Sequence, residues 1–150
     1  MSEAPYGAER PPYVISTDPA RLDIDAIWGW LRESYWSPGV PRETVARAIR
    51  NSLPFGIFEA ERQVGFARVV TDRATFAYLA DVFIDPAARR RGLAVWLMEV
   101  ISAHPDLQGL RRWMLATRDA HGLYAKFGFR PLARPELFME IHRPDVYGAG

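Results

Sequence analysis

Apolar residues recur along the chain with two spacings, one typical of helices and one typical of strands. Between Ile24 and Leu31 they return every three to four positions, directly after Asp23, whose carboxylate suits a helix N-cap. This pattern predicts an amphipathic helix that begins at Asp23. Three further helices are predicted over residues 42–51, 92–103 and 121–127.

Runs of apolar and β-branched residues between polar turns predict the strands. FGIFEA (55–60) and QVGFARVVT (63–71) flank a tight polar turn, which is typical of a hairpin. TFAYLADVFI (75–84) is apolar at nearly every position, as expected for a central strand that is covered on both faces. Further strands are predicted over residues 13–16, 112–117, 129–132 and 137–142.

The order of these elements predicts one α/β domain of the α+β kind. Two helices come first, an antiparallel run of strands follows, and strand and helix then alternate. This order indicates a central, mixed but mostly antiparallel sheet of six to seven strands, with about four helices on both faces. We expect residues 1–12, which are rich in proline, to form a flexible tail and residues 13–150 to form the domain.

Composition narrows the range of functions. The net charge of +1 argues against a general nucleic-acid-binding protein, and no apolar run is long enough to span a membrane. The start of the chain has no secretory signal and there is no cysteine, so a cytoplasmic enzyme is the simplest interpretation. The three histidines lack metal-ligand spacing, and we therefore expect no metal site. Of the 19 basic residues, 18 are arginine, which mostly indicates codon bias.

The segment RRRGLA (89–94) has the features of an anion-binding turn. It follows a buried strand and leads directly into an amphipathic helix, whose first amides are unpaired and carry a positive partial charge. Gly92 allows close approach of a ligand to the backbone, and Arg89, Arg90 and Arg91 add positive charge. The alternative is that these arginines are only solvated charges at the start of a helix.

This segment resembles the GNAT superfamily of N-acetyltransferases, whose signature for the coenzyme A pyrophosphate is Gln/Arg-x-x-Gly-x-Gly/Ala. The resemblance implies that acetyl-CoA binds here and that the preceding strand binds the pantetheine arm through its backbone. The residues implied in cofactor binding are Val82, Phe83, Ile84, Arg89, Arg90, Arg91, Gly92, Leu93 and Ala94.

A second block, ATRDAHGLYAKFGF (116–129), resembles the family's next conserved segment. By that resemblance Tyr124 is the acid that protonates the departing thiolate, and a phenol remains protonated at neutral pH. The asparagine often found seven residues earlier is Thr117 here. Taken alone, Tyr124 would more simply be a half-buried packing residue, but two motifs at the family's spacing favour the catalytic role.

The base and the acceptor site are less defined by the sequence. Asp81 is the only acid within 75–84, and an acid in an apolar strand is either functional or paired, for example with Arg68 on the neighbouring strand. These two alternatives stay open. The family commonly builds its acceptor pocket from the connection between the first two helices, so Tyr35 and Trp36 are candidate substrate residues, whereas Trp28 fits the helix core.

The sequence therefore predicts transfer of the acetyl group of acetyl-CoA to an amine by direct attack. The acceptor is a small molecule or a peptide of unspecified identity. Members of the family often form homodimers, so the resemblance is also compatible with a homodimer. The alternative is a non-catalytic acyl-CoA-binding or regulatory domain of the same fold. A nucleotide-binding module that uses the same anion turn is a third and weaker alternative.

Overall fold

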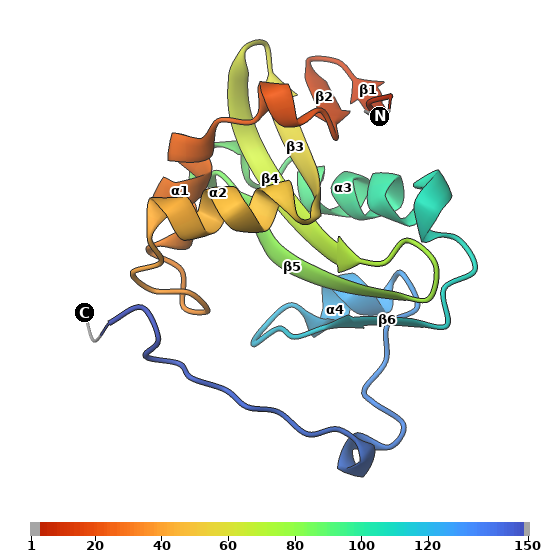
Figure 1. Ribbon diagram of the computed structural model, residues 1–150. Helices are drawn as coiled ribbons and strands as arrows, with labels where there is room; N and C mark the ends of the chain where they lie inside the picture. Colours follow the sequence, from red (N-terminus) through yellow and green to blue (C-terminus); the bar gives the residue numbers. More distant parts are fainter. Residues whose placement is uncertain (1–3, 149–150) are drawn as a thin grey trace.

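Strand order in the sheet follows the order of the chain in the computed structural model, which describes residues 4–148 (Figure 1). Each strand pairs with the next in antiparallel fashion, except that the last two are parallel. The strands are β1 (Gly7–Arg10), β2 (Tyr13–Ser16), β3 (Leu53–Glu59), β4 (Arg62–Thr71), β5 (Phe76–Ile84) and β6 (Arg112–Leu115).

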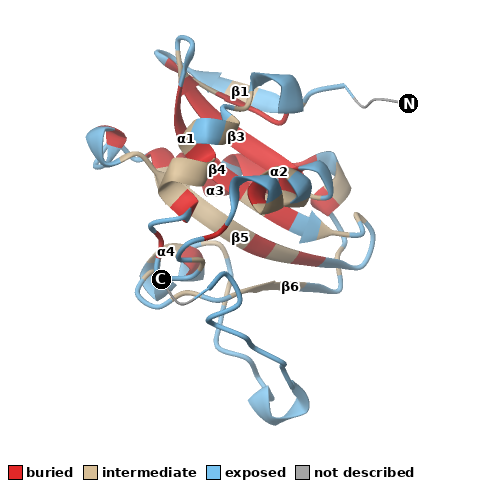
Figure 2. Cartoon of the chain, turned by 60° about the vertical axis from the view of Figure 1, so that its left-hand side comes forward, coloured by how far each residue is buried: buried red, intermediate tan, exposed pale blue. Residues whose placement is uncertain are grey.

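Helices cover both faces of this sheet, because each face presents a row of apolar side chains. On one face α1 and α2 enclose a cluster that includes Phe66, while α3 and α4 pack against the larger cluster on the other face (Figures 1 and 2). The helices are α1 (Ile24–Leu31), α2 (Arg42–Arg50), α3 (Leu93–Ser102) and α4 (His121–Ala125). Short 3-10 helices span Pro19–Arg21, Pro86–Ala88, Pro105–Leu107 and Pro135–Leu137.

The predicted fold class is confirmed, since residues 4–148 form six strands in a mixed sheet and four α-helices. The first helix begins as its cap predicts, since the Asp23 carboxylate accepts a hydrogen bond from the Ala26 amide at 3.0 Å. Within residues 4–148, no helix combines the length and apolar character that a membrane span requires.

The predicted flexible tail needs correction. Residues Gly7–Arg10 form β1 and pair with β2 in the register Gly7↔Ser16 to Arg10↔Tyr13. Tyr6 fixes the start of this strand, because its amide donates to the Thr17 hydroxyl and its ring packs on His104. The sequence did not predict this strand, because residues 1–12 are rich in proline and poor in apolar residues. Residues 1–3 of the predicted tail lie outside the described part of the chain.

The two predicted closing strands, over residues 129–132 and 137–142, do not form in this structure. From Gly128 to residue 148 the backbone pairs with no strand, and only the 3-10 turn Pro135–Leu137 interrupts it. Every residue from 130 to 148 is exposed, and the segment leaves the sheet after α4 and returns toward the connection between α1 and α2, where Tyr147 lines a small cavity (Figures 1 and 2). A strand needs a neighbouring strand to satisfy its peptide groups, and this segment pairs with none within residues 4–148, although the outer side of β6 is free.

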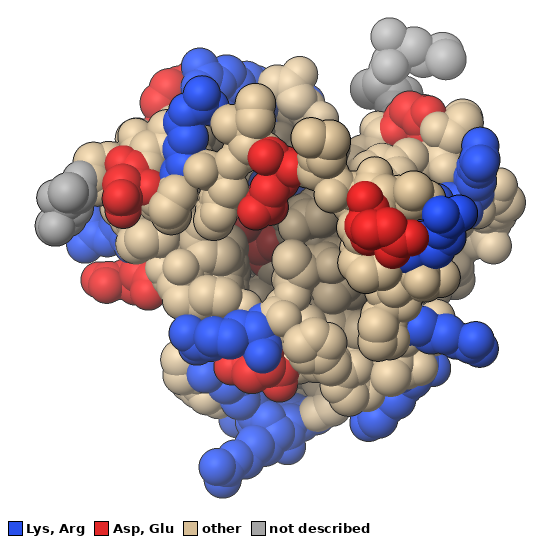
Figure 3. Space-filling view, turned by 90° about the horizontal axis from the view of Figure 1, so that it is seen from below, with Lys and Arg blue, Asp and Glu red and all other residues tan. Residues whose placement is uncertain are grey.

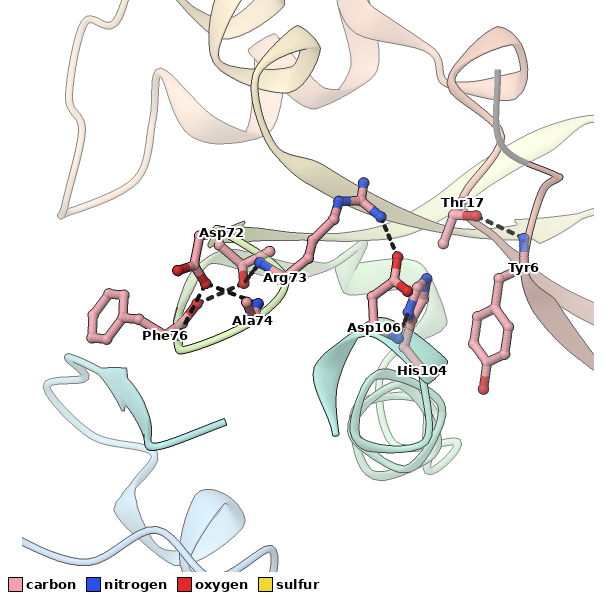
Figure 4. Close-up of polar contacts among 9 residues, drawn as sticks. Tyr6, Thr17, Asp72, Arg73, Ala74, Phe76, His104 and Asp106 are labelled. Atoms are coloured by element: carbon pink, nitrogen blue, oxygen red, sulfur yellow. Dashed lines mark hydrogen bonds and ion pairs between the residues drawn. The ribbon is translucent and has the colours of Figure 1, made fainter. Parts of the chain in front are cut away.

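The turn between β4 and β5 is fixed by side chains at the end of β5 that is remote from Ile84 (Figure 4). One Asp72 oxygen accepts hydrogen bonds from the amides of Ala74, Thr75 and Phe76 at 2.8–3.1 Å. The Thr75 hydroxyl donates to the other oxygen, and these bonds hold the pKa of Asp72 well below its usual range. Arg73 joins the turn to the region after α3 through Asp106 at 2.6 Å.

We predict that Asp72→Asn lowers the thermal midpoint at pH 7, because the amide accepts these hydrogen bonds without a charge. The folded-state pKa of Asp72 is lowered, so its stabilisation is fully present above about pH 4 and is lost as the pH falls through the folded value. The difference from wild type should therefore shrink in acid, measured by thermal unfolding at pH 7, 5 and 3. Asp145→Asn serves as the control, and a difference that is independent of pH would contradict the prediction.

Candidate active site

The parallel strands β5 and β6 stay together over only four residue pairs. Their register runs from Phe76↔Arg112 to Leu79↔Leu115, and β5 then continues to Ile84 while it pairs with β4 alone. The β6 side of residues 80–84 thus has no strand beside it. Because parallel strands end at the same edge of a sheet, α3 and α4, which follow them, both lie at this edge.

A β-bulge bends β5 where the two strands part. Asp81 and Val82 together oppose the single residue Ala67, since the register passes from Arg68↔Ala80 to Phe66↔Phe83. Asp81 carries the irregularity with a φ of 57°, in the left-handed region that aspartate tolerates better than most residues. The bulge turns the Asp81 side chain out of the regular alternation of the strand.

The Asp81 carboxylate is fully engaged. One oxygen accepts a hydrogen bond from Arg68 Nε at 2.8 Å, and the other accepts one from the Trp36 indole at 2.9 Å. The Asp81 and Arg68 side chains are 12% and 19% exposed, and Arg68 also donates to the Ser52 hydroxyl. Of the two alternatives that the sequence left open for Asp81, the pairing with Arg68 is confirmed.

The predicted anion turn leads into α3 through backbone geometry that leaves its first amides accessible. Gly92 is the N-cap of α3 with a φ of 73°, and within residues 4–148 no side chain caps the first turn of this helix. A Cβ atom placed on Gly92 would meet no heavy atom within 4 Å, so the space in front of the turn is open. An anion there would meet unpaired N–H groups and the positive end of the helix dipole.

Two of the three arginines in this turn fasten it to the sheet. Arg89 Nε donates to the Ile84 carbonyl at 2.9 Å and its guanidinium lies over the Phe83 ring. Arg91 donates to the Tyr13 hydroxyl, and this bond raises the pKa of the guanidinium. Arg90 is exposed and adopts a φ of 65°. The prediction that all three arginines surround the ligand is therefore too simple, because Arg89 and Arg91 also hold the turn in place.

The predicted pantetheine segment lies along the unpaired edge of β5. Val82 and Ile84 pack against the cluster under α3 and α4. Phe83 points to the opposite face, where its ring stacks on Trp30 with centroids 5.3 Å apart. With both sets of side chains packed, the backbone edge is what this segment presents to a ligand.

Tyr124 lies on α4, within the cluster beneath β5 and β6. It is 8% exposed, and its ring meets that of Phe129 at 6.1 Å between centroids. Burial, and then the neighbouring Tyr35 phenol, raise the pKa of Tyr124 to about 12. Its hydroxyl makes no hydrogen bond to any residue in the described range 4–148. The phenol thus keeps its proton at neutral pH.

The connection between α1 and α2 reaches Asp81 of β5 and the segment before α4. The Tyr35 hydroxyl accepts a hydrogen bond from the Arg118 amide at 3.0 Å, and the Arg118 guanidinium lies 3.9 Å from the Tyr35 ring centroid. Trp36 meets Tyr35 edge to face and donates to Asp81. Tyr35 and Trp36 are 47% and 40% exposed. The structure therefore brings Trp36 to Asp81 and Tyr35 near Tyr124.

A small cavity of about 70 Å³ lies behind this connection, between the helices α1 and α2 and the sheet. Apolar side chains form most of its wall, and Arg68 and Asp81 supply the charged part. The face seen in Figure 3 is hollowed, with acidic atoms visible inside the hollow and both acidic and basic side chains around its margin. Trp28 is absent from the lining, and its indole donates to the Val40 carbonyl, as expected for a packing residue.

Sequence reasoning missed two contacts that shape the site. Tyr13 holds Arg91 and Arg118 holds Tyr35, and neither residue stands at a fixed position of the two motifs. Thr117 stands where the family often has asparagine. Its hydroxyl accepts a hydrogen bond from the Ala120 amide at 3.1 Å, so it orders the turn before α4. Among residues 4–148, no group of three or more potential ligands could hold a metal ion.

Comparisons with known proteins agree with this geometry. Residues 51–131 match the family model described as an acetyltransferase (GNAT) domain. A putative acetyltransferase of Gibberella zeae is 34% identical over 145 residues, with 81% of each chain covered.

Solved structures resemble most of the chain. A crystal structure of a putative GNAT-family acetyltransferase from Xanthomonas campestris pv. campestris is 50% identical, covers 94% of this chain and 100% of its own, and gives a TM-score of 0.91. A predicted acetyltransferase with acetyl-CoA from Clostridium acetobutylicum shares the fold at 13% identity, with a TM-score of 0.60 and coverage of 79% and 86%. The chain described here belongs to the GNAT family of acetyltransferases.

Proposed function

We propose that this acetyltransferase moves the acetyl group of acetyl-CoA directly to an amine, with Tyr124 as the acid that protonates the leaving thiolate. One observation carries the proposal. The uncapped first turn of α3 and the helix α4 follow the two parallel strands at one edge of the sheet, and Tyr124 of α4 belongs to the cluster against which Val82 and Ile84 of the open β5 edge pack. That arrangement suits a ligand with an anionic end, an extended arm and a reactive end.

The chain's own groups fit the coenzyme. The first amides of α3 and the exposed Arg90 suit the pyrophosphate, and Gly92 leaves room for it. The peptide groups of residues 82–84 suit the amides of a pantetheine arm, since an edge strand offers alternating donors and acceptors. Arg89 and Arg91 act less directly, because they hold the turn in the conformation that aims its amides outward.

Acetyl-CoA supplies a thioester, whose acetyl group forms a new bond to the amine nitrogen as the bond to sulfur breaks. Tyr124 then gives its proton to the sulfur and regains one from solvent. Burial keeps the phenol protonated at any physiological pH, since the pKa of Tyr124 is raised to about 12. Because no described residue accepts its proton, Tyr124 is ready to donate to a sulfur atom placed beside it.

The acceptor amine approaches from the side of Tyr35 and Trp36. Their exposed rings offer aromatic faces to an apolar or cationic amine, and both are held by hydrogen bonds to the sheet or to the segment before α4. GNAT acetyltransferases act on amine acceptors, so this wall is the part of the site that would select among amines. Its aromatic character favours a flat or hydrophobic amine over a strongly hydrated one.

Asp81 is better suited to positioning than to proton abstraction. Both of its oxygens accept hydrogen bonds, and through Trp36 it fixes the connection that carries the acceptor wall. Its role as the base stays a prediction from the sequence. We infer that the amine loses its proton to solvent and that the carboxylate holds Trp36 and Arg68.

We predict that Tyr124→Phe lowers kcat by about 10²- to 10⁴-fold, the usual contribution of general acid catalysis. Affinity for coenzyme A should stay within a few-fold, because the ring and its packing remain. Steady-state kinetics with a reactive amine measure kcat, and calorimetry measures the affinity for coenzyme A. Tyr78→Phe is the matched control, as it removes a phenol from β5 outside the site. Wild-type turnover in Tyr124→Phe would contradict the role of acid.

We predict that Gly92→Val abolishes measurable binding of coenzyme A, because the branched side chain enters the open space before the α3 amides and strains a φ of 73°. Gly109→Val is a close control. Gly109 has a φ of 70°, and a Cβ there also meets nothing within 4 Å. Calorimetry should show normal affinity for the control variant. Equal losses in the two variants would mean that strain, and not the turn, explains the effect.

We predict that Asp81→Asn and Arg68→Gln each raise the KM for the acceptor, lower kcat by less than about 10-fold, and destabilise the fold by about 1–3 kcal/mol. The double variant should change KM, kcat and stability little more than either single variant does, because both substitutions break the same ion pair. Kinetics across pH and chemical denaturation test this. A base at Asp81 would instead give a loss of about 100-fold or more in kcat for Asp81→Asn alone, with an altered pH profile.

A further inference from the structure

No step of the acetyl transfer uses the cavity between the helices α1 and α2 and the sheet. Its volume is about 70 Å³, whereas protein interiors are close-packed and hold few voids larger than a water molecule. The apolar residues of its wall are Leu31, Val40, Val45, Ala48, Ile49 and Phe66. An unfilled apolar space beside a reaction site is a candidate for one end of a substrate.

Asp81 joins this cavity to the acceptor wall. Its carboxylate lines the cavity and accepts the hydrogen bond of the Trp36 indole at 2.9 Å. Ser37, the residue after Trp36, also lines the cavity. The connection that carries the acceptor wall thus forms part of the cavity wall as well, so a group attached to an amine at Trp36 has this cavity next to it.

The charges of the cavity wall cancel. Among the described residues that line it, only Arg68 and Asp81 are charged, and they form an ion pair at 2.8 Å. A charged group in the cavity would lose its hydration and meet no uncompensated partner, which is costly. An apolar group would gain from leaving water. The cavity therefore suits an uncharged aliphatic group.

The volume decides between a chain and a ring. A dry apolar cavity of about 150 Å³ holds benzene. About half of that volume is too small for an aromatic ring and holds roughly three carbon atoms of a chain. The aromatic wall alone would accept a flat or an aliphatic amine, and the cavity distinguishes between them.

We propose that this cavity is the specificity pocket of the acceptor and that the preferred acceptor is a short primary alkylamine with a chain of about three to four carbons. The amine stays at Tyr35 and Trp36, and its chain passes Asp81 into the cavity. This assignment rests on the proposed function, because it concerns the far end of the amine that attacks acetyl-CoA.

Ala48 limits the length of chain that the pocket accepts. It has the smallest apolar side chain of the wall and follows Thr44, which also lines the cavity, by one turn of α2. Both residues are half-buried. A larger side chain at position 48 can therefore enter the cavity without displacing the fully buried core.

The first test is kcat/KM for ethylamine, propylamine, butylamine and hexylamine, which ionise alike. We expect a rise of about fourfold for each methylene up to butylamine, the factor that burial of one CH₂ group gives, and no further rise at hexylamine. Benzylamine and 4-aminobutyrate should be poorer than butylamine by at least about 10-fold, because one carries a ring and the other a charge.

The second test changes the pocket and compares two amines on the same enzyme preparation, so that partial unfolding does not affect the ratio. Ala48→Leu should lower the ratio of butylamine to ethylamine kcat/KM by at least about 10-fold. Val45→Ala enlarges the pocket and should raise the ratio of hexylamine to butylamine by about fourfold. Ala46→Leu is the matched control, since Ala46 is half-buried on α2 and is not among the described residues that line the cavity.

The outcomes separate the pocket from the reaction. Transfer that is independent of chain length, or ratios that Ala48→Leu and Val45→Ala leave unchanged, would overturn the pocket while the proposed function stands. Equal shifts in Ala48→Leu and Ala46→Leu would overturn it too. A failure to acetylate any amine, with acetyl-CoA bound, would contradict the proposed function and the pocket with it.

Discussion

The limited pairing of β5 with β6 is the constraint on which the site depends. The two strands share four residue pairs, and the bulge at Asp81 then bends β5 away while it remains bound to β4. Two things follow from this single departure from a regular sheet. The backbone edge of residues 80–84 has no strand on its β6 side, and α3 and α4, which follow the two strands, lie at this same edge of the sheet.

Side chains from distant parts of the sequence stabilise this open arrangement. Arg68 and Trp36 hold the bulge, Tyr35 joins the connection between α1 and α2 to Arg118, and Tyr13 holds the anion turn through Arg91. Each of these contacts joins one element at the site to another that is remote in sequence. The site is therefore supported from both faces of the sheet, and neither hydrophobic cluster alone determines it.

The sequence was sufficient for the parts of the fold that local chemistry determines. Asp23 and the apolar spacing after it located α1, and the two motifs located the turn before α3 and the tyrosine on α4. The sequence was insufficient where an element forms only if another strand or side chain of the fold pairs with it. The strand at Gly7–Arg10 is polar and forms because it pairs with β2, whereas LFMEIH has a strand's pattern and pairs with no strand of the described chain. The pairing of Asp81 with Arg68 depended on a register that only the fold defines.

Position 81 illustrates how narrowly such a bulge limits the amino acids that it tolerates. Its backbone conformation favours glycine and, after it, asparagine and aspartate, since other side chains crowd their own carbonyl there. Its surroundings demand two acceptor oxygens, one for a guanidinium and one for an indole. Glycine suits the backbone conformation but has no acceptor oxygens. Glutamate has the two oxygens but does not suit the backbone conformation. Aspartate meets both, so in a set of homologues with this bulge and this pair of donors, position 81 should vary far less than its partly exposed neighbours.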